Sequence, residues 1–267
     1  MVIITGASAG VGAETARAFA KHGAKLVLIA RGQKALTEIS NELSRITDVL
    51  SFAADVCATD AYEKILIEAE NHFGDIHILI NNAGYHKRGD VEKNDPRDLA
   101  KMVEVNLSAP IALSALTLPY IQKHKNGAIV NVGSLAGRAP LQGAATYSAT
   151  KAGLRAFTYA LADEVDEPNI HIGLVSPGPI DTGFIMSEID DVEDIVFSQE
   201  MSSAQQVAQA ILDVAAGKSI EISLPKSGGR LTMLSYLFPW LRRKVRPALY
   251  KKGRKEKEKY RQRNLNN

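Results

Sequence analysis

The sequence predicts an α/β fold in which a doubly wound parallel β-sheet is covered by helices on both faces. Three observations predict this fold class. Short β-branched and aliphatic runs alternate with longer segments rich in Ala, Glu, Leu and Lys, which is the pattern of repeated strand–helix–strand units. A glycine-rich turn joins the first strand to the first helix. The length of 267 residues suits one α/β domain, and right-handed crossovers then wind the sheet in both directions.

Seven strands are expected, at Val2–Thr5, Lys25–Ala30, Val49–Ala53, His77–Asn81, Gly127–Val132, Ile170–Val175 and Ile220–Leu224. Segments with helical spacing lie between them and include Ala13–Lys21, Gln33–Ser44, Ala61–Phe73 and Ala204–Ala216. This strict alternation stops beyond Pro225. We therefore expect one domain over residues 1–225 and a separate C-terminal extension over residues 226–267.

Helix boundaries are indicated by a few residues. Gly23, Gly74 and Gly217 follow predicted helices at the position where a left-handed residue often ends a helix. Asp95 precedes Pro96, so Asp95 is a candidate N-cap for a helix that begins with proline.

The composition, with 45% hydrophobic and 23% charged residues, is that of an ordinary globular protein and excludes a disordered chain. The single cysteine, Cys57, excludes an internal disulfide and a multi-cysteine metal site. The six histidines lack metal-ligand spacing, so no metal is expected. The start of the chain has neither the basic segment nor the long apolar run of a signal peptide, which predicts a cytoplasmic location.

The turn after the first strand indicates a dinucleotide site. Gly6, Gly10 and Gly12 permit a tight turn and the close approach of a pyrophosphate to backbone N–H groups. The positive end of the following helix dipole would face the phosphates. A purely structural turn is the alternative. However, the strand before it, the helix after it and a second strand about twenty residues on are the context that such a site requires.

The end of the second strand distinguishes between two cofactors. An acidic residue there would accept hydrogen bonds from the ribose 2′-hydroxyl of NAD(H), but this sequence has Ala30 followed by Arg31. The Arg31 guanidinium can pair with the 2′-phosphate of NADP(H). We expect NADP(H) rather than NAD(H), and a solvated surface role for Arg31 is the alternative.

A phenol and an ammonium, Tyr147 and Lys151, are spaced four residues apart, which puts both on one face of a helix. Ser134 comes shortly after the predicted strand at 127–132. A Tyr-x-x-x-Lys pair is common by chance and usually lies on a surface. It becomes informative only together with the glycine turn.

Six motifs in this order resemble those of the short-chain dehydrogenase/reductase family, in its single-domain branch. They are the Thr5–Gly12 turn, Asp55-Val56, Asn81-Asn82-Ala83-Gly84, Asn106, Ser134 with Tyr147-x-x-x-Lys151, and Pro177-Gly178-Pro179-Ile180-Asp181-Thr182. The resemblance covers about residues 1–225. It implies a Rossmann-type fold, hydride transfer with a nicotinamide cofactor, and assembly as a homodimer or homotetramer.

The resemblance also assigns four catalytic residues. It implies that Tyr147 exchanges a proton with the substrate oxygen, and that Lys151 favours the phenolate and binds the nicotinamide ribose. Ser134 would hydrogen-bond the substrate oxygen. Asn106 would hold a water in a proton relay to Lys151. The alternatives are a turn role for Ser134 and a polar helix-interior role for Asn106.

The remaining matched residues are assigned to the cofactor. The resemblance implies adenine contacts at Asp55 and Val56, with helix capping as the alternative for Asp55. The expected cofactor-binding residues are Gly6, Ser8, Gly10, Val11, Gly12, Arg31, Asp55, Val56, Asn82, Ala83, Gly84, Tyr147, Lys151, Pro177, Gly178, Ile180 and Thr182.

The substrate is expected to be apolar. In the family a mobile lid follows the Pro-Gly motif, and here that segment spans roughly residues 183–203. It contains apolar side chains such as Phe184 and Ile195 and a run of acids over 190–194. Inward-facing apolar side chains would suit a hydrophobic carbonyl or alcohol, and the acids could form the outer, solvated face.

The C-terminal extension concentrates positive charge. Residues 241–263 hold 12 Lys and Arg and two Glu, whereas the rest of the chain holds 20 Lys and Arg and 28 Asp and Glu. An apolar run, Leu231–Leu241, precedes the basic segment. Three interpretations remain: docking of residues 231–263 on an anionic membrane, packing of the apolar run on the body or a second subunit with a solvated basic tail, and nucleic-acid binding, which the acidic body opposes.

Together these observations predict an NADP(H)-dependent oxidoreductase that interconverts a carbonyl and a secondary alcohol by hydride transfer. An apolar or lipid-like substrate is expected. The alternative is a non-catalytic NADP-sensing regulator or a membrane-docking interaction protein on the same fold. Loss of Tyr147 or Lys151 would have favoured that alternative, and both residues are present.

Overall fold

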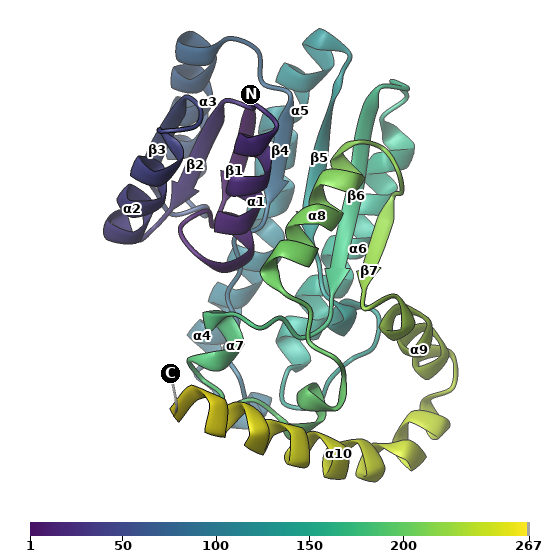
Figure 1. Cartoon of the computed structure of the whole chain (residues 1–267). Helices are drawn as coiled ribbons and strands as arrows, with labels where there is room; N and C mark the ends of the chain where they lie inside the picture. The colour runs from purple at the N-terminus through teal and green to yellow at the C-terminus, as the bar shows by residue number, and fades with distance from the viewer. Residues whose placement is uncertain (266–267) are drawn as a thin grey trace.

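The computed structural model describes residues 1–265, with all side chains in that range except those of residues 230, 231, 233–235, 264 and 265. Seven parallel strands form one sheet in the order β3-β2-β1-β4-β5-β6-β7 (Figure 1). The strands are β1 Val2–Thr5, β2 Leu26–Ala30, β3 Val49–Ala53, β4 Ile78–Asn81, β5 Gly127–Val132, β6 Ile170–Pro177 and β7 Glu221–Leu224. The strand order runs outward in both directions from β1, so the predicted doubly wound sheet is confirmed.

The central strands are buried on both faces, which explains their continuous aliphatic sequences. In β1 and β2 every residue is buried, and the parallel register pairs Ile3 with Val27 and Ile4 with Leu28. All seven predicted strands are present. The main difference is β6, which extends two residues further than expected, to Pro177. This extension carries the strand into the Pro-Gly motif.

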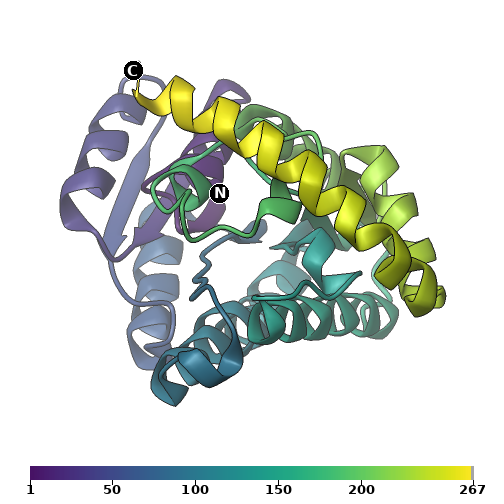
Figure 2. The same ribbon diagram turned by 90° about the horizontal axis from the view of Figure 1, so that it is seen from below.

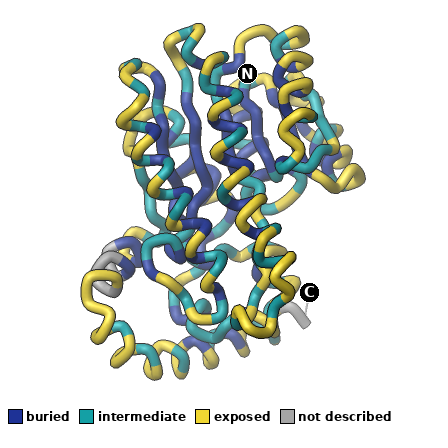
Figure 3. Tube along the Cα trace, turned by 180° about the vertical axis from the view of Figure 1, so that it is seen from behind, coloured by how far each residue is buried: buried dark blue, intermediate teal, exposed yellow. Residues whose placement is uncertain are grey.

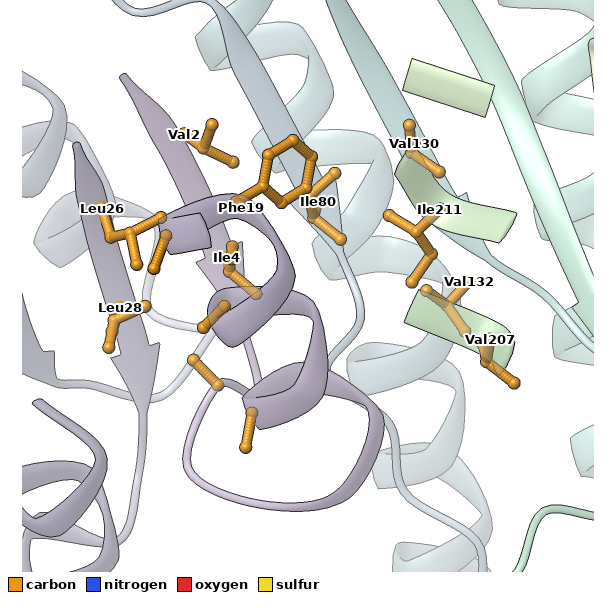
Figure 4. Close-up of a cluster of buried hydrophobic side chains, with 14 of the residues drawn as sticks. Val2, Ile4, Phe19, Leu26, Leu28, Ile80, Val130, Val132, Val207 and Ile211 are labelled. Atoms are coloured by element: carbon orange, nitrogen blue, oxygen red, sulfur yellow. The ribbon is translucent and has the colours of Figure 1, made fainter. Parts of the chain in front are cut away.

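Helices cover the two faces of the sheet. One face is covered by α1 (Gly10–Lys21), α2 (Gln33–Leu43) and α8 (Ala204–Ala215). Phe19, Ile4 and Ile211 belong to this layer of the core (Figure 4). The other face is covered by α3 (Thr59–Phe73), α5 (Ala109–His124) and α6 (Ala145–Glu164). The strands between the two layers are buried while the outer sides of the helices are exposed (Figure 3).

The predicted helix boundaries follow local chemistry. The Asp95 side chain accepts a hydrogen bond from the Arg97 N–H and caps α4 (Pro96–Val103), as expected. Gly23 follows α1 with φ +75°, and Gly217 follows α8 with φ +73°, so both adopt the left-handed conformation that favours glycine.

Short elements complete the chain at the carboxyl edge of the sheet. They are the 3₁₀ helices η1 (Val91–Lys93), η3 (Leu135–Gly137) and η4 (Asp194–Ser198), the π-helical η2 (Glu104–Ser108), and α7 (Gly183–Met186). The helical stretch Pro96–His124, formed by α4, η2 and α5, is the one among the described residues that is long and apolar enough to cross a membrane. Its side chains Leu113 and Ile121 pack in the core of the sheet.

The C-terminal extension forms two helices, α9 (Lys226–Leu237) and α10 (Pro239–Leu265). The long helix α10 crosses the carboxyl edge of the sheet and lies against η4 in the lid segment (Figures 1 and 2). This differs from the solvated basic tail in one of the three interpretations of the extension. The reason is electrostatic, because the acidic run of the lid pairs with the C-terminal half of α10.

The apolar run 231–241 spans the junction of α9 and α10. Its members Tyr236, Leu237, Phe238 and Trp240 are exposed, at 65%, 60%, 45% and 65%. The side chains of Leu231, Met233, Leu234 and Ser235 lie outside the described part of the structure. Thus the basic segment contacts the body, while Tyr236, Leu237, Phe238 and Trp240 of the apolar run are exposed.

Candidate active site

A cavity of about 1220 Å³ opens at the carboxyl edge of the sheet. It brings together most of the residues singled out in the sequence, although they come from distant parts of the chain. Those that line it are Gly6, Ser8, Gly10, Val11, Gly12, Asn82, Ala83, Gly84, Ser134, Tyr147, Lys151, Pro177, Gly178, Ile180 and Thr182.

The glycine turn has the shape that its residues require. Gly6 has φ +66° and Gly10 has φ +54°, both in the left-handed region. A Cβ at Gly12 would overlap the carbonyl oxygen of Gly6, so only glycine allows α1 to approach the turn this closely. The turn therefore presents backbone to the cavity at the N-terminal end of α1, which is a favourable arrangement for a phosphate group.

Asn82 ties this turn to the next strand. Its Nδ2 donates hydrogen bonds to the carbonyl oxygens of Thr5 and Gly6, at 2.9 and 3.2 Å. The Thr5 hydroxyl in return accepts from the backbone N–H groups of Asn82 and Ala83, at 3.0 and 3.1 Å. These bonds fix the turn against the segment 82–84, so that both line one wall of the cavity.

Three predicted cofactor residues lie outside the lining of this cavity. Arg31 is exposed at the end of β2. Asp55 accepts a hydrogen bond from the Cys57 N–H at 3.0 Å and lies 3.5 Å from the Lys101 ammonium. The hydrogen bond to Cys57 lowers the pKa of Asp55, and the positive charges of Lys101 and Arg31 act in the same direction. Val56 is 7% exposed and packs in the core.

Tyr147 and Ser134 face the cavity from different elements. Tyr147 belongs to the first turns of α6, and Ser134 follows β5 and caps η3 by accepting from the Ala136 N–H at 3.1 Å. Burial raises the pKa of the Tyr147 phenol, whereas hydrogen bonding with Ser134 and the positive charge of Arg88 lower it. Both hydroxyls line the same cavity, in reach of one ligand.

Lys151 is a buried cation beside the phenol. Its side chain is 5% exposed, and Nζ lies 5.8 Å from the centroid of the Tyr147 ring. Nζ donates a hydrogen bond to the carbonyl oxygen of Val132 at 2.8 Å, which holds the side chain against the end of β5. Burial lowers the pKa of Lys151 to about 8, because the charged form is poorly solvated there.

Asn106 is fully buried in the π-helical turn η2. Its Oδ1 accepts from the Tyr85 N–H at 2.8 Å, and its Nδ2 donates to the Tyr85 carbonyl at 2.6 Å and to the Thr150 hydroxyl at 3.5 Å. The side chain thus joins the segment after Gly84 to α6, one residue before Lys151. Single-turn π-helical segments often occur at functional sites.

His86 and Arg88 belong to the site but were not singled out from the sequence. Both line the cavity just beyond the segment 82–84. Arg88 Nη1 donates to His86 Nδ1 at 3.1 Å, and Arg88 Nη2 donates to the Phe184 carbonyl oxygen at 2.7 Å. Burial lowers the pKa of His86 to about 3, with the charges of Arg88 and Lys151 acting in the same direction. Only their position next to the Asn-Asn-Ala-Gly motif could have pointed to them.

The expected lid forms an apolar wall. Phe184, Ile185, Ile195 and Val196 line the cavity, which agrees with the inward-facing side chains expected from the sequence. Behind them Val192 and Phe197 form a small core that Tyr260 of α10 joins. The lid is thus packed from behind by the C-terminal extension.

The acidic run of the lid contacts α10 rather than forming a solvated face. Arg254 lies 3.1 Å from Asp194, and the nearly buried Lys257 lies 3.5 Å from the same carboxylate. Lys257 Nζ also donates to the carbonyl oxygen of Val192 at 2.6 Å. Tyr250 donates to Glu193 at 3.0 Å. These contacts hold the lid and α10 together.

Several known proteins are similar to this chain. A family model described as short chain dehydrogenase matches residues 1–193. An uncharacterized oxidoreductase of Staphylococcus epidermidis is 31% identical over 212 residues, which cover 79% of this chain and 89% of the relative. Dehydrogenase/reductase SDR family member 7B of Bos taurus is 32% identical over 271 residues, covering 96% and 83%. The 3-oxoacyl-[acyl-carrier-protein] reductase FabG of Escherichia coli (strain K12) is 29% identical over 227 residues, covering 84% and 92%.

Solved structures resemble the whole fold. A short-chain dehydrogenase from Streptomyces avermitilis has a TM-score of 0.76 at 25% identity and covers 92% of this chain and 94% of its own. A short chain dehydrogenase/reductase from Burkholderia phymatum in complex with NAD has a TM-score of 0.81 at 22% identity, covering 90% and 94%. Since the family model spans most of the chain and two relatives exceed 30% identity, this chain belongs to the short-chain dehydrogenase/reductase family of oxidoreductases.

Proposed function

We propose that this protein is an NADP(H)-dependent enzyme that interconverts a carbonyl and a secondary alcohol on an apolar substrate. One observation carries the proposal: Tyr147, Ser134 and Lys151 line the same cavity as the glycine turn. One site would therefore hold a donor for the substrate oxygen, a cation that favours the phenolate, and a turn that can bind phosphate.

The residues present fit a nicotinamide dinucleotide. The turn at 6–12, where a Cβ at Gly12 would overlap the Gly6 carbonyl, offers a close-fitting backbone cradle for the pyrophosphate. The adenine end would lie toward Asp55 and Val56, the ribose beside segment 82–84, and the nicotinamide against Pro177, Gly178, Ile180 and Thr182. When bound, the reduced nicotinamide supplies a hydride to the carbonyl carbon.

The protein side of the reaction is proton transfer and charge stabilisation. Tyr147 donates its phenolic proton to the carbonyl oxygen in reduction and accepts it back in oxidation. Ser134 donates a hydrogen bond to the same oxygen as negative charge develops on it. A free phenol has a pKa of about 10, so the Lys151 and Arg88 cations are needed to make the phenolate accessible near neutral pH. Asn106, held against Tyr85 and Thr150, is proposed to position a water in the proton relay to Lys151.

The position of Arg31 favours a preference for NADP(H) over NAD(H). Its exposed guanidinium follows β2, where an acidic residue would bind the 2′-hydroxyl of NAD. Arg31 forms no ion pair with any carboxylate in the described part of the chain, and the nearby Asp55 pairs with Lys101. The guanidinium is thus accessible to a 2′-phosphate. The relative from Burkholderia phymatum, which binds NAD, shares the fold at 22% identity, so it does not decide the cofactor of this chain.

The test of the proposed reaction removes the Tyr147 hydroxyl. Tyr147→Phe is expected to lower NADPH oxidation with ketones, aldehydes or 3-oxoacyl compounds by at least about 100-fold, the size of general acid catalysis. NADPH binding, followed by fluorescence, should persist. Tyr159→Phe on the same helix removes a phenol that contacts Glu221 instead and should keep turnover. Turnover of Tyr147→Phe within a few-fold of the unmodified protein would contradict the mechanism.

A second candidate function is docking on an anionic membrane surface through residues 231–263. It is favoured by the exposure of Tyr236 and Trp240, both 65% accessible, beside the basic residues 242–244. Trp and Tyr side chains favour the membrane interface, and each nearby cation adds about 1 kcal/mol.

Sedimentation with phosphatidylserine-containing vesicles tests this candidate. The variant Phe238→Ser/Trp240→Ser should lose vesicle binding. The matched variant Ile46→Ser/Ile67→Ser removes two exposed apolar side chains elsewhere, 57% and 53% accessible, and should keep it. A full-length protein that does not sediment with vesicles contradicts the candidate.

We further propose that the enzyme assembles as a homodimer or homotetramer. Val103 of α4 and Ile111 of α5 are large apolar side chains exposed at 38% and 37% on one helical stretch, a surface that a second subunit can cover. Light scattering after gel filtration tests this assembly. A monomeric mass at micromolar concentration contradicts it.

A further inference from the structure

The two halves of α10 use their cations differently. In the C-terminal half Arg254, Arg261 and Arg263 form ion pairs with Asp194, Asp190 and Asp181, at 3.1, 2.5 and 2.7 Å. In the N-terminal half Arg242, Arg243 and Arg246 have no ion pair with a described carboxylate. The three arginines of the N-terminal half are thus available to a ligand, whereas those of the C-terminal half hold the helix on the body.

These three arginines line the same cavity as Tyr147 and Ser134. Leu241, Val245 and Leu249 of the same half of α10 line the cavity as well. The cavity therefore has apolar walls, formed by the lid and α10, and a group of arginines from α10 that adds to the charges of Arg88 and Lys151 beside Tyr147. A cavity with this combination suits a ligand that has both an apolar chain and an anionic group.

The surroundings of Arg246 keep its charge available. The guanidinium lies over the ring of Tyr250, 5.4 Å from the ring centroid, and the Tyr250 hydroxyl donates to Glu193 at 3.0 Å. The Glu193 carboxylate of the lid therefore accepts a hydrogen bond from the Tyr250 phenol and forms no ion pair with Arg246. Guanidinium groups bind carboxylate and phosphate through two parallel hydrogen bonds, which makes arginine well suited to such head groups.

We propose that Arg242, Arg243 and Arg246 bind the anionic head group, a phosphate or a carboxylate, of a substrate whose apolar chain lies in the cavity. The substrate class is then an acidic amphiphile with a carbonyl or secondary alcohol on its chain. This inference rests on the proposed function, because it places the reacting carbon of that amphiphile at Tyr147.

Binding of inert amphiphiles tests the head-group site without turnover. Decyl phosphate, decanoate and decanol, each below its critical micelle concentration, are titrated calorimetrically into the full-length protein. At least one acidic amphiphile should bind roughly tenfold or more tightly than decanol, as expected for a charge-assisted hydrogen bond. The comparison of decyl phosphate with decanoate identifies which head group the site prefers.

Two triple variants test whether the three arginines cause the tighter binding of the acidic amphiphile. Arg242→Gln/Arg243→Gln/Arg246→Gln should reduce the affinity for the acidic amphiphile to that for decanol. Lys244→Gln/Lys251→Gln/Lys255→Gln removes the same charge from exposed positions of α10 outside the cavity lining and should keep the preference. Equal affinities for the acidic and neutral compounds in the unmodified protein overturn the proposal. So does an equal loss of affinity in both triple variants.

A turnover measurement separates this inference from the proposed function. If no chain-bearing ketone is reduced with NADPH but decyl phosphate binds through the three arginines, the proposed reaction fails and the head-group site stands. If neutral and acidic ketones are reduced with equal KM, the reaction stands and the head-group site fails. In the expected case the arginine triple variant raises the KM of the acidic ketone and leaves the KM of the neutral one unchanged.

Discussion

The imidazole of His86 lies parallel to the phenol of Tyr147, with ring centroids 4.1 Å apart and an interplanar angle of 15°. Arg88 can only donate, so its hydrogen bond to His86 Nδ1 requires that atom to be an acceptor. The neutral ring then carries its proton on Nε2, which has no hydrogen-bond partner among the described residues. Arg88 thus fixes the tautomer of a ring that covers the phenol, and it places a guanidinium beside the proposed acid.

The first prediction concerns the charge of Arg88. Because a positive charge favours phenolate, Arg88→Gln should raise the pKa of Tyr147. In alcohol oxidation the phenolate is the active form, so the rising limb of the kcat/KM profile should move to higher pH, by about 0.5–1 unit. The measurement is the pH dependence of oxidation with saturating cofactor.

Two variants control for loss of packing. Arg88→Lys keeps the charge and should keep the limb near its original pH. Glu188→Gln removes the carboxylate that lies 3.3 Å from Arg88 Nε but leaves the guanidinium. The rising limb of its kcat/KM profile should therefore not shift to higher pH. An unchanged limb in Arg88→Gln would show that Arg88 does not influence the phenol.

The second prediction concerns the choice of cofactor. Arg31→Glu should weaken NADPH binding at least about tenfold, because a carboxylate would repel the 2′-phosphate, and should change NADH binding far less. The Kd values of both cofactors are measured by fluorescence. Lys101→Gln removes another cation near Asp55 and should not discriminate between them. Equal losses for NADPH and NADH in Arg31→Glu would refute the contact with the phosphate.

The sheet could be predicted from the sequence because its strands are buried on both faces. Ile3 and Val27 pair in a register that leaves both fully buried, and such burial produces the aliphatic runs from which the strands were located. The glycine turn was equally predictable, since Gly6 and Gly12 meet steric requirements that no other residue meets. The strands and the glycine turn depend on residues close together in the sequence or on the regular alternation of strands and helices.

The position of α10 could not be predicted in the same way. The acidic run of the lid and the basic run of the extension are both visible in the sequence, but Arg261 pairs with Asp190 across 71 residues. Periodicity gives no information about such a pairing. One of the three interpretations lets the apolar run and the basic segment dock together on a membrane, whereas in the structure the C-terminal half of the basic segment pairs with the lid. The contributions of Arg242 and Leu249 to the cavity depend on that placement, so they too were not predicted.

The third prediction concerns the free energy of unfolding. Lowering the pKa of Lys151 from 10.5 to about 8 corresponds to roughly 3 kcal/mol of destabilisation while the residue is charged. Lys151→Met removes this penalty but also removes the hydrogen bond to the Val132 carbonyl, worth about 1 kcal/mol. The inactive variant should therefore be more stable at pH 7 by about 2 kcal/mol.

The pH dependence of this stability difference follows from the number of protons that the folded and unfolded states bind. Below pH 8 Lys151 is charged in both the folded and the unfolded protein, so the penalty is complete. Between pH 8 and 10.5 the unfolded state binds more protons, and the stability of the unmodified protein rises with pH. Urea unfolding should show the advantage of Lys151→Met shrinking through this window. Lys64→Met makes the same substitution at an exposed position of α3 and should not stabilise the protein at pH 7.

The last prediction concerns the docking of α10 on the lid through Gly253. This residue is buried inside a long helix, and a Cβ there would overlap the carbonyl oxygen of Asp194. In an exposed helix Gly→Ala stabilises by about 1 kcal/mol, so helix propensity alone predicts a more stable protein. Here the methyl group should instead push α10 away from the lid and weaken the contacts that Tyr250 and Lys257 make with it.

Limited chymotrypsin digestion distinguishes these two outcomes, because Tyr250 and Tyr260 are partly covered when α10 is docked. Gly253→Ala should be cleaved faster at these sites than the unmodified protein and should lower the melting temperature. Lys255→Ala changes an exposed position of the same helix and should leave the cleavage rate unchanged. If Gly253→Ala instead resists cleavage and melts at a higher temperature, helix propensity dominates, and the close approach of α10 to Asp194 does not hold the lid.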